Sequence, residues 1–495
     1  MNTKSIRFIL GWILNIEALL MLLPVGTAAF YREEEGVAYA LVMALCAAIG
    51  ALLTYKKPKN PNFYAKEGFI CTAMGWIVMS IFGCLPFMLT GEIPSFVDAM
   101  FEMVSGFTTT GASVVENVEL LSHCTNMWRC LSHWIGGMGI LVFLLAVLPL
   151  VGGSNMQLMK AESPGPSVGK LVPKVRFTAR ILYYLYVALT LLQVVVMLLG
   201  GMTLYEALCT SFGTAGTGGF GIRSDSIASF SPFLQWAITI FMIAFGVNFN
   251  VYFLLYMRRP KEALRCEEMR WYLAIITAAA LLIFVNAYDA ALTIEHNLRQ
   301  SFFQVASIIT TTGFATADFN LWPGFSRGIL VLLMFIGACA GSTGGGFKVS
   351  RIVIGFKSVL AYLGAFLHPR AVRKVKFEDK DVDSDTMHAI CVYFIAAIGL
   401  FVISVLLISL DGFDLVSTFT AVAATFNNVG PGLGMAGPSS NFAAFSDFSK
   451  IVMTMDMLLG RLEVFPMLML FYPPLWKESI EEARIRRNRA ARLKR

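Results

Sequence analysis

Long apolar runs separated by short polar segments dominate this chain of 495 residues. Runs of about 20 residues with few charges have the length of a transmembrane helix. The pattern predicts ten such helices, at residues 8–30, 38–55, 69–89, 127–150, 181–200, 233–256, 271–289, 327–362, 388–410 and 450–475. Four shorter apolar segments lie between them, at residues 93–106, 204–212, 298–309 and 415–426. Because segments of about 10–14 apolar residues are too short to cross a bilayer, we interpret these four as re-entrant half-helices.

The composition is that of a membrane protein. Hydrophobic residues make up 57% of the chain and charged residues only 14%, against about 25% charged residues in soluble domains. A basic tail at residues 484–495 is typical of attraction to anionic membrane lipid. Its closeness to the last apolar run argues against nucleic acid as a partner.

The basic residues fall on alternate loops and predict the orientation. Six segments contain 29 of the 39 Lys and Arg residues, at residues 1–7, 55–67, 151–180, 257–270, 364–386 and 476–495. Since cytoplasmic loops are enriched in Lys and Arg, both termini are expected in the cytoplasm. The chain must then cross the membrane an even number of times between successive basic segments.

This constraint predicts a repeated unit of helix, half-helix, glycine loop and helix. Both ends of every unit are cytoplasmic, so all four half-helices enter from the outside and the units run parallel. The predicted fold is an all-α integral membrane protein with ten transmembrane helices. Four parallel helix–pore-loop–helix repeats surround one pore, preceded by two leading helices. The expected boundaries are 1–66 for the leading helices, 67–176, 177–266, 267–384 and 385–476 for the repeats, and 477–495 for the cytoplasmic tail.

A short glycine motif follows each half-helix. The motifs are Thr109-Thr110-Gly111-Ala112, Gly216-Thr217-Gly218-Gly219, Thr311-Thr312-Gly313-Phe314 and Asn428-Val429-Gly430-Pro431. A single motif of this kind is typical of a turn or of close helix packing. Four in the same topological position predict a ring of backbone carbonyls that replaces the hydration shell of a cation. The predicted filter residues are Thr109, Thr110, Gly111, Thr217, Gly218, Thr311, Thr312, Gly313, Asn428, Val429 and Gly430.

The last helix of the third repeat is interrupted at residues 337–348. Its glycines and small polar residues are unsuited to a lipid-facing helix, so the segment is expected to line a cavity or break the helix. The alternative is tight helix packing. The segment lacks the spacing of a phosphate-binding loop. The residues predicted to form a barrier below the filter are Gly341, Gly344, Gly345, Gly346, Lys348 and Arg461.

Arg461 is a charge within an apolar run, which usually marks a functional interior position. We hypothesise that it contacts the 337–348 segment and sets a positive barrier. A local pair with Glu463 is the alternative, although residues two apart on a helix do not face each other. For Lys348, the alternative is a side chain that extends to the membrane surface.

Other charges have simpler interpretations. Acidic residues near the pore-loop ends are expected either to concentrate cations or to be solvated, at Asp98, Glu102, Glu116, Glu119, Glu206, Asp225, Glu295, Asp318, Asp411 and Asp414. The mixed-sign run 378–385 is expected to be a solvated cytoplasmic loop, with a partner contact as the alternative.

Two further motifs carry a family resemblance. The run His133-Trp134-Ile135-Gly136-Gly137-Met138-Gly139 and the stretch from Met156 to Pro166, together with the four glycine loops, resemble the Trk/Ktr/HKT superfamily of potassium transporters. The two leading helices favour the Trk form over the shorter Ktr form. The resemblance implies potassium uptake across the bacterial inner membrane, with K⁺ as the transported ion and residues 337–348 as an intramembrane gating loop.

The resemblance also implies partners. These are a second copy of the chain in a homodimer, with one pore in each subunit, and a cytoplasmic nucleotide-binding regulatory subunit, TrkA. The chain itself is not expected to bind a cofactor, and nucleotide is expected only on that subunit.

Three other functions remain to be compared. An H⁺- or Na⁺-coupled cation symporter of the same family is the main alternative. A carrier of another fold predicts inverted repeats and buried carboxylates at mid-span, and neither is evident in the sequence. An intramembrane enzyme needs a nucleophile or metal constellation, and no such motif is found, so the chain is not expected to be an enzyme.

Overall fold

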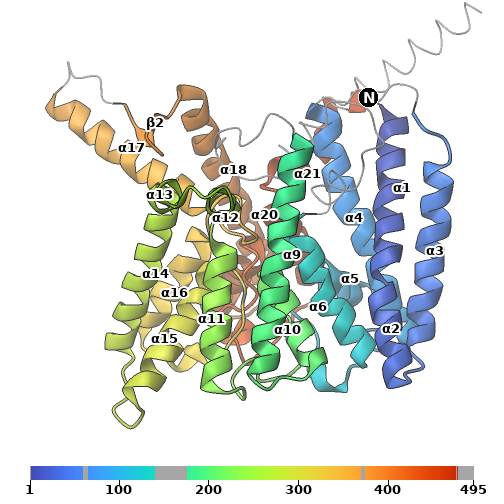
Figure 1. Ribbon diagram of the computed structural model, residues 1–495. Helices are drawn as coiled ribbons and strands as arrows, with labels where there is room; N and C mark the ends of the chain where they lie inside the picture. Colours follow the sequence, from blue (N-terminus) through green and yellow to red (C-terminus); the bar gives the residue numbers. More distant parts are fainter. Residues whose placement is uncertain (1, 59–64, 140–174, 369–373, 475, 478–495) are drawn as a thin grey trace, which may run out of the picture.

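The computed structural model describes residues 2–58, 65–139, 175–368, 374–474 and 476–477 (Figure 1). Several predicted features lie outside these ranges. They are the second half of the 127–150 run, the family stretch 156–166, most of the basic segment 151–180 and the tail 478–495.

The two leading helices are present. Helices α1 (Thr3–Leu20) and α2 (Leu22–Tyr31) form one apolar run of 29 residues, and α3 (Gly36–Thr54) follows it. Close packing of α1 on α3 depends on glycine, because a Cβ added at Gly11 would lie 2.7 Å from the Cβ of Leu53. These helices flank the bundle on one side (Figure 1).

Four units of the same design follow. The first helices of the units are α4 (Ala65–Thr90), α9 (Val175–Leu199), α14 (Glu267–Asn286) and α18 (Ser384–Ile408). The half-helices are α5 (Phe96–Phe107), α10 (Leu204–Gly216), α15 (Ile294–Ile309) and α19 (Leu415–Phe426). The second helices are α6 (His123–Gly137), α11 (Pro232–Gly246), α16 (Gly324–Ile336) and α20 (Asp447–Arg461). Short 3₁₀ turns lie in the connections, at Val118–Leu120, Phe319–Leu321, Ser409–Asp411 and Gly434–Ala436.

The half-helices begin in the same way. Ser95, Thr203, Thr293 and Asp414 each cap one of them by accepting a hydrogen bond from the backbone N–H three residues later. A polar cap of this type satisfies an otherwise unpaired N–H and fixes where the helix starts. With 12, 13, 16 and 12 residues, the half-helices are too short for a bilayer core of about 30 Å.

The second helices are shorter than predicted, and this corrects the sequence analysis. The predicted helix 233–256 is split into α11 and α12 (Phe249–Tyr256), which are bent by 90°. The predicted helix 450–475 is likewise split, into α20 and α21 (Phe465–Leu470). The helix 327–362 is split into α16 and α17 (Val349–Leu367), as the interruption at residues 337–348 predicted. Seven helices of the described part are long and apolar enough to cross a membrane, or up to eight if the bent pair is one span.

Glycines explain where the second helices break. A Cβ added at Gly136 or Gly460 would collide with the carbonyl oxygen of Phe107 or Phe426, the last residues of two half-helices. Glycine therefore lets α6 and α20 contact the ends of their half-helices. The same residues weaken the helix, so it ends beside the half-helix instead of continuing straight.

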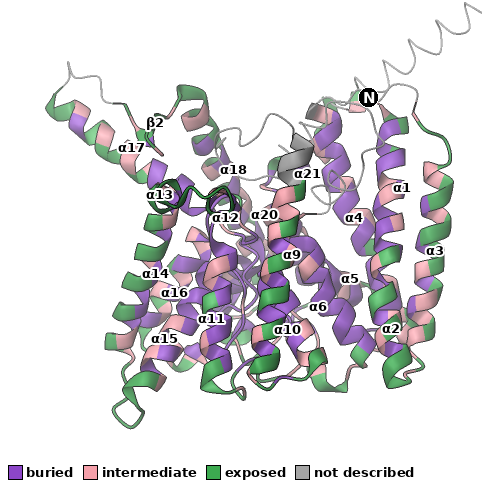
Figure 2. Cartoon of the chain, in the orientation of Figure 1, coloured by how far each residue is buried: buried purple, intermediate pink, exposed green. Residues whose placement is uncertain are grey.

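The units are arranged around a buried centre. The half-helices lie among buried residues, and exposed residues cover the outer helices (Figure 2). Large apolar side chains are exposed on those outer helices, among them Leu52, Leu199, Val285 and Leu363. An apolar outer surface is expected where lipid is the solvent. The N-terminus, α13 (Pro260–Arg265) and β2 (Lys380–Asp381) lie at the same end of the molecule, so three of the predicted basic segments share one side (Figure 1).

The mixed-sign run contains a small hairpin, so its interpretation as a solvated loop is partly wrong. Strand β1 (Lys376–Phe377) pairs antiparallel with β2. Phe377 is buried, and the Glu378 carboxylate accepts a hydrogen bond from the backbone N–H of Glu268, at 3.1 Å. The hairpin is therefore docked on the start of α14.

Buried carboxylates are present within the helices, contrary to the sequence-based expectation. Glu17 on α1 and Asp456 on α20 are each 1% exposed. Among the described residues, neither oxygen of Glu17 has a hydrogen-bond partner, while one oxygen of Asp456 accepts from the Ser404 hydroxyl at 2.6 Å. Each is an acid within an apolar run, a signal of an interior position that the sequence analysis used for Arg461 but overlooked for these two residues.

Candidate functional site

The four glycine loops share one backbone conformation. Each half-helix is followed by a left-handed residue with φ of 56–58°, at Thr109, Thr217, Thr311 and Asn428. Two residues later comes a left-handed glycine with φ of 81–98°, at Gly111, Gly219, Gly313 and Gly430. In each loop the residue between them donates its N–H back to the carbonyl five residues earlier, at 2.7–2.9 Å. This pairing satisfies a carbonyl that the end of the half-helix would otherwise leave free.

This pattern corrects the predicted register of the second loop by one residue. Gly219, and not Gly218, occupies the position of Gly111 and Gly313. Gly218 takes the place of Thr110 instead. The Gly-Thr-Gly-Gly sequence offers two glycines, and only the backbone conformation distinguishes them.

The loops close into a ring. A Cβ added at Gly111 would collide with the carbonyl oxygen of Gly218, and one at Gly219 with that of Thr312. In the same way, Gly313 lies against the carbonyl of Val429, and a Cβ at Gly430 would lie 2.7 Å from the carbonyl oxygen of Thr110. Each loop therefore contacts the next, and the fourth returns to the first.

The ring faces a cavity of about 210 Å³, whose lining includes Gly111, Gly219, Gly313 and Gly430. Four neutral carbonyl-bearing loops at the base of a hollow can supply the oxygen ligands that a monovalent cation needs when it loses water. Each half-helix also directs its partially negative C-terminal end toward the ring, which favours cations over anions. Within the described ranges, no three His, Cys, Asp or Glu side chains are placed to hold a metal ion, so the oxygen donors here are backbone and hydroxyl groups.

Two side chains that the sequence did not identify as ring supports hold the loops in place. The Nδ1 of His133 lies 2.8 Å from the carbonyl oxygen of Gly106, and its Nε2 accepts from the N–H of Phe220 at 3.0 Å. These two roles fit a neutral imidazole protonated on Nδ1. His133 therefore ties the first half-helix to the second loop.

Asn428 makes the fourth loop different from the others. Its amide donates to the Thr110 hydroxyl and to the carbonyl of Met457, both at 2.9 Å. The side chain thus links the fourth loop to the first and to α20. The other three loops have threonine at the position of Asn428, namely Thr109, Thr217 and Thr311.

The interrupted segment 337–348 lies directly against the ring. The N–H of Gly345 donates to the Thr311 hydroxyl at 2.7 Å, and the N–H of Gly346 donates to the carbonyl of Asn427 at 3.1 Å. A Cβ added at Gly344 would lie 2.8 Å from the carbonyl oxygen of Thr310. The segment therefore breaks the helix, as predicted, and touches the ends of the third and fourth half-helices; we call it the intramembrane loop, after its predicted position.

A second cavity, of about 100 Å³, lies on the other side of this loop. Its lining includes Gly341, Gly344, Gly345, Gly346, Lys348 and Arg461. The four glycine loops and the intramembrane loop therefore separate an outer cavity from an inner one. All six residues predicted for the barrier are brought together there.

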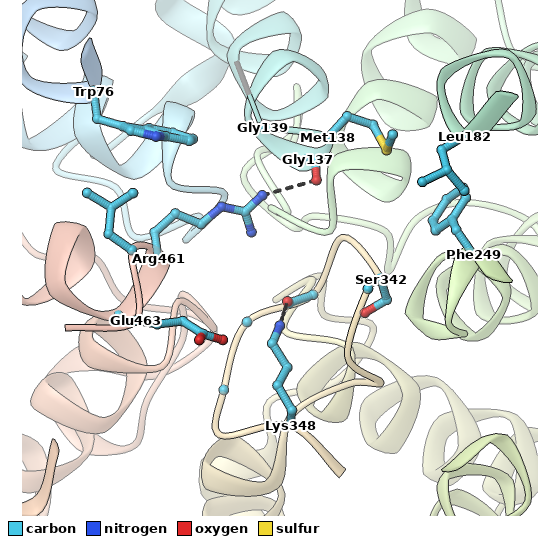
Figure 3. Close-up of a pocket in the computed structure, with 16 residues that line it drawn as sticks. Trp76, Gly137, Met138, Gly139, Leu182, Phe249, Ser342, Lys348, Arg461 and Glu463 are labelled. Atoms are coloured by element: carbon cyan, nitrogen blue, oxygen red, sulfur yellow. Dashed lines mark hydrogen bonds between the residues drawn. The ribbon is translucent and has the colours of Figure 1, made fainter. Parts of the chain in front are cut away.

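Arg461 reaches across the inner cavity. Its Nη1 donates to the carbonyl of Thr343 at 2.9 Å, and its Nη2 donates to the carbonyls of Gly136 and Gly137, the latter at 3.1 Å. Figure 3 shows the guanidinium pointing toward Gly137 beneath Trp76. Its contact with the intramembrane loop agrees with the hypothesis drawn from the sequence.

Glu463 does not have the local role that was the alternative for Arg461. It forms a bidentate ion pair with Arg351 on α17, at 2.5 and 3.1 Å. Arg351 also lies over the Tyr393 ring, 4.3 Å from its centroid. This pair joins the end of the intramembrane loop to the segment after α20.

Lys348 is buried at 3% exposure and does not extend to the surface. Its ammonium donates to the carbonyl of Gly344 within the same loop (Figure 3). The inner cavity is therefore bordered by two positive side chains, Lys348 and Arg461, with Glu463 nearby.

Several outer acids are held in ion pairs and are not free in solvent. Glu102, at 0% side-chain exposure, pairs with Arg129 at 2.6 Å and accepts from the Ser113 hydroxyl and the Val114 N–H, both at 2.9 Å. Asp98 pairs with Lys450, and Glu206 with Arg223. Of the ten predicted acids, only Glu116 lines the outer cavity.

Replacing Arg129 with Met is expected to lower the free energy of unfolding by about 3–5 kcal/mol, because Glu102 would remain buried without its partner. The measurement is the fraction of purified protein that stays monodisperse after heating. Arg223→Met is the matched control, since its pair with Glu206 is more exposed, at 37% and 18%, and is worth about 0–1 kcal/mol. Equal losses of thermal stability in Arg129→Met and Arg223→Met would contradict the larger effect expected for the buried pair.

Comparison with known proteins identifies the family. The model of the TrkH family, described as cation transport protein, matches residues 36–287 and 270–481. The chain belongs to the TrkH family of cation transport proteins. The family resemblance inferred from the sequence is thereby confirmed.

Individual members of the TrkH family match along almost the whole chain. The Trk system potassium uptake protein TrkH of Salmonella typhimurium LT2 is 37% identical, covering 97% of this chain and 100% of that protein. TrkG of Escherichia coli K12 is 33% identical, covering 96% and 100%. The crystal structure of the potassium transporter TrkH from Vibrio parahaemolyticus matches with a TM-score of 0.86 at 33% identity, covering 96% of this chain and 100% of that one.

Proposed function

We propose that this protein takes up potassium across the bacterial inner membrane, with K⁺ as the transported ion. The chain crosses the membrane ten times with both termini in the cytoplasm, and each broken second helix counts as one crossing with its continuation. Four parallel units surround one pore. The relatives named as potassium uptake proteins support the choice of ion.

The closed ring of four loops is the observation that carries this proposal. One backbone carbonyl of each loop packs against the glycine of a neighbouring loop. These carbonyls belong to Thr110, Gly218, Thr312 and Val429. A cavity lies on each side of the ring and the intramembrane loop. An ion that passes from one cavity to the other meets backbone oxygen first and the intramembrane loop next. We assign the ring as the selectivity filter and residues 337–348 as its gate.

In this proposal, control comes from the cytoplasmic side. The gate is closed by the contacts of Gly345 and Gly346 with the ring and of Arg461 with Thr343. The chain acts as a homodimer, and the nucleotide-binding subunit TrkA shifts the gate when nucleotide binds to TrkA. A ligand shifts such an equilibrium only if it binds one gate state more tightly than the other.

The chain is expected to restore growth of a potassium-uptake-deficient bacterium at low external K⁺ when it is expressed with a compatible TrkA. The measurement is the growth rate against external K⁺ concentration, beside an empty vector and the Gly313→Ser variant. Growth no better than with the empty vector, with protein present in the membrane, would refute the proposal.

A proton- or sodium-coupled symporter with looser K⁺ over Na⁺ selectivity is the second candidate. The buried carboxylates of Glu17 and Asp456 favour it, because a buried acid can carry a proton. Vesicles that contain the purified chain distinguish the two candidates. Through a pore, K⁺ entry follows the K⁺ gradient and voltage alone, whereas in a symporter it also follows an imposed H⁺ or Na⁺ gradient.

A further inference from the structure

We infer that Glu268 is the anchor of the intramembrane loop and that the cytoplasmic hairpin controls this anchor through Glu378. The inference rests on the proposed function, since it assigns a means of regulation to the same gate. Neither Glu268 nor Glu378 lines the outer or the inner cavity.

Glu268 fastens both ends of the intramembrane loop. It lies in the first turn of α14 and is 1% exposed. Its Oε1 accepts from the N–H of Ala340 at 2.7 Å and from the N–H of Ser350 at 3.1 Å. These two amides lie on either side of the segment that contains Gly344, Gly345 and Gly346. One carboxyl oxygen of Glu268 therefore holds the intramembrane loop at two points, Ala340 and Ser350.

The second carboxyl oxygen of Glu268 contacts another broken helix. Its Oε2 accepts from the Asn248 amide at 3.3 Å, at the bend between α11 and α12. The adjacent Phe249 N–H donates to the carbonyl of Gly341 at 3.1 Å. The same carboxylate therefore joins the breaks of the second and third units. Without this carboxyl, the buried N–H groups of Ala340 and Ser350 would lose their acceptor, so Glu268 contributes substantially to the loop position.

The hairpin acts on the neighbouring atoms of α14. This helix begins at Glu267 with no side-chain cap from its own N-cap residue, Cys266. The Glu378 carboxylate supplies the cap from outside, accepting from the Glu268 N–H at 3.1 Å and from the Cys266 thiol at 3.3 Å. A negative charge at a helix N-terminus is favourable because the free N–H groups there are partly positive. The capped amide and the anchoring carboxylate belong to the same residue.

A second contact fixes the hairpin to α17, the helix that follows the intramembrane loop. Lys357 on α17 forms an ion pair with Glu267 and donates to the carbonyl of Lys376 at 2.8 Å. The hairpin turn has φ of 51° at Glu378 and 58° at Asp379, a conformation that glycine or asparagine usually adopts in such turns. Two non-glycine residues held there imply strain that the docking contacts of Glu378 offset. The hairpin, the start of α14 and α17 therefore move as one body, and a displaced hairpin would shift Glu268.

The first measurement is hydrogen exchange of the peptide that contains residues 338–350, in the purified full-length protein. Glu268→Ala is expected to raise its exchange rate about tenfold, since the acceptor of two backbone amides is lost. Glu378→Ala, which leaves Glu268 in place, is expected to raise it about threefold through loss of the helix cap. Asp379→Ala is the matched control, because Asp379 is the exposed neighbour in the same strained turn, and its effect should stay within about twofold.

The second measurement is K⁺ flux through the same proteins in vesicles without the regulatory subunit. Both variants are expected to raise the K⁺ flux, Glu268→Ala more than Glu378→Ala. The ratio of K⁺ to Na⁺ flux should stay unchanged, because neither substitution alters the ring. When Glu268 is already replaced by Ala, adding Glu378→Ala should not raise the K⁺ flux further, since Glu378 acts through Glu268. Glu268→Gln retains one oxygen acceptor and should give a smaller increase than Glu268→Ala.

The two measurements separate the possible failures. Unchanged exchange in Glu268→Ala and Glu268→Gln would overturn the anchor, whatever the flux. Equal effects of Glu378→Ala and Asp379→Ala, or full additivity with Glu268→Ala, would overturn the role of the hairpin. Absence of K⁺ flux in the wild-type chain and in both variants, even after the regulatory subunit and its nucleotide are added, with the exchange pattern as expected, would refute the proposed function while the anchor stands.

Discussion

Serine in place of Gly313 is expected to reduce K⁺ influx about a hundredfold and to remove the preference for K⁺ over Na⁺. Gly313 has φ of 81°, where a side chain is strained by about 1–3 kcal/mol, and 2.7 kcal/mol corresponds to about a hundredfold. The added Cβ would also collide with the carbonyl oxygen of Val429 and lie 2.9 Å from the Cδ of Pro431. Backbone cannot yield as a flexible side chain does, so the ring itself must open. The measurement is K⁺ and Na⁺ influx into vesicles.

Gly328→Ser is the matched control for this prediction. Gly328 lies on α16 in the same unit, and a Cβ added there meets no atom within 4 Å. This variant should transport like the wild type. Size-exclusion profiles of both variants separate a damaged ring from a misfolded protein. Normal selectivity in a folded Gly313→Ser protein would show that Gly313 is not part of the filter.

Removal of the Arg461 side chain, as in Arg461→Ala, is expected to raise K⁺ flux about tenfold in the absence of the regulatory subunit. The guanidinium puts a positive charge in the inner cavity, where the low dielectric strengthens its repulsion of a cation. It also holds Thr343 of the intramembrane loop against Gly136 and Gly137 of α6. The substitution removes both the charge and the brace. The measurement is K⁺ flux with and without added regulatory subunit.

Two further variants identify the cause. Arg461→Lys keeps the charge but replaces the forked guanidinium with a single ammonium, so part of the barrier should remain. Arg259→Ala removes an exposed arginine, with 57% side-chain exposure, and should leave the flux unaltered. If flux and its regulation were the same in Arg461→Ala as in the wild type, Arg461 would have no part in gating.

The lengths of the apolar runs were sufficient to predict the order of long helices and half-helices, because helix length and apolar character are local properties. Polar caps at Ser95, Thr203, Thr293 and Asp414 then mark where the half-helices begin. The breaks in α11 and α20 were missed. Single glycines such as Gly246 and Gly460 do not disrupt an apolar run, and their effect depends on distant contacts, of Gly246 with Tyr272 on α14 and of Gly460 with Phe426 on α19.

The contents of the site were predicted better than its geometry. The structure brings together the residues proposed for the ring and the barrier, but the register of the second loop required the backbone conformation of Thr217 and Gly219. The pairing of Glu463 with Arg351 joins residues 112 positions apart, which no local pattern encodes. The docking of Glu378 on α14 was hidden for the same reason.

The circular order of the four loops has a further consequence. All four sides of the ring are encoded in one chain, so a single codon change alters one side and leaves the other three intact. In an assembly of four identical chains, the same change would be copied to every side at once. The Asn428 bridge to Thr110 and the valine at position 429 are changes of this one-sided kind. In this architecture, mutations can therefore change the ion preference through one of the four loops while the other three stay the same.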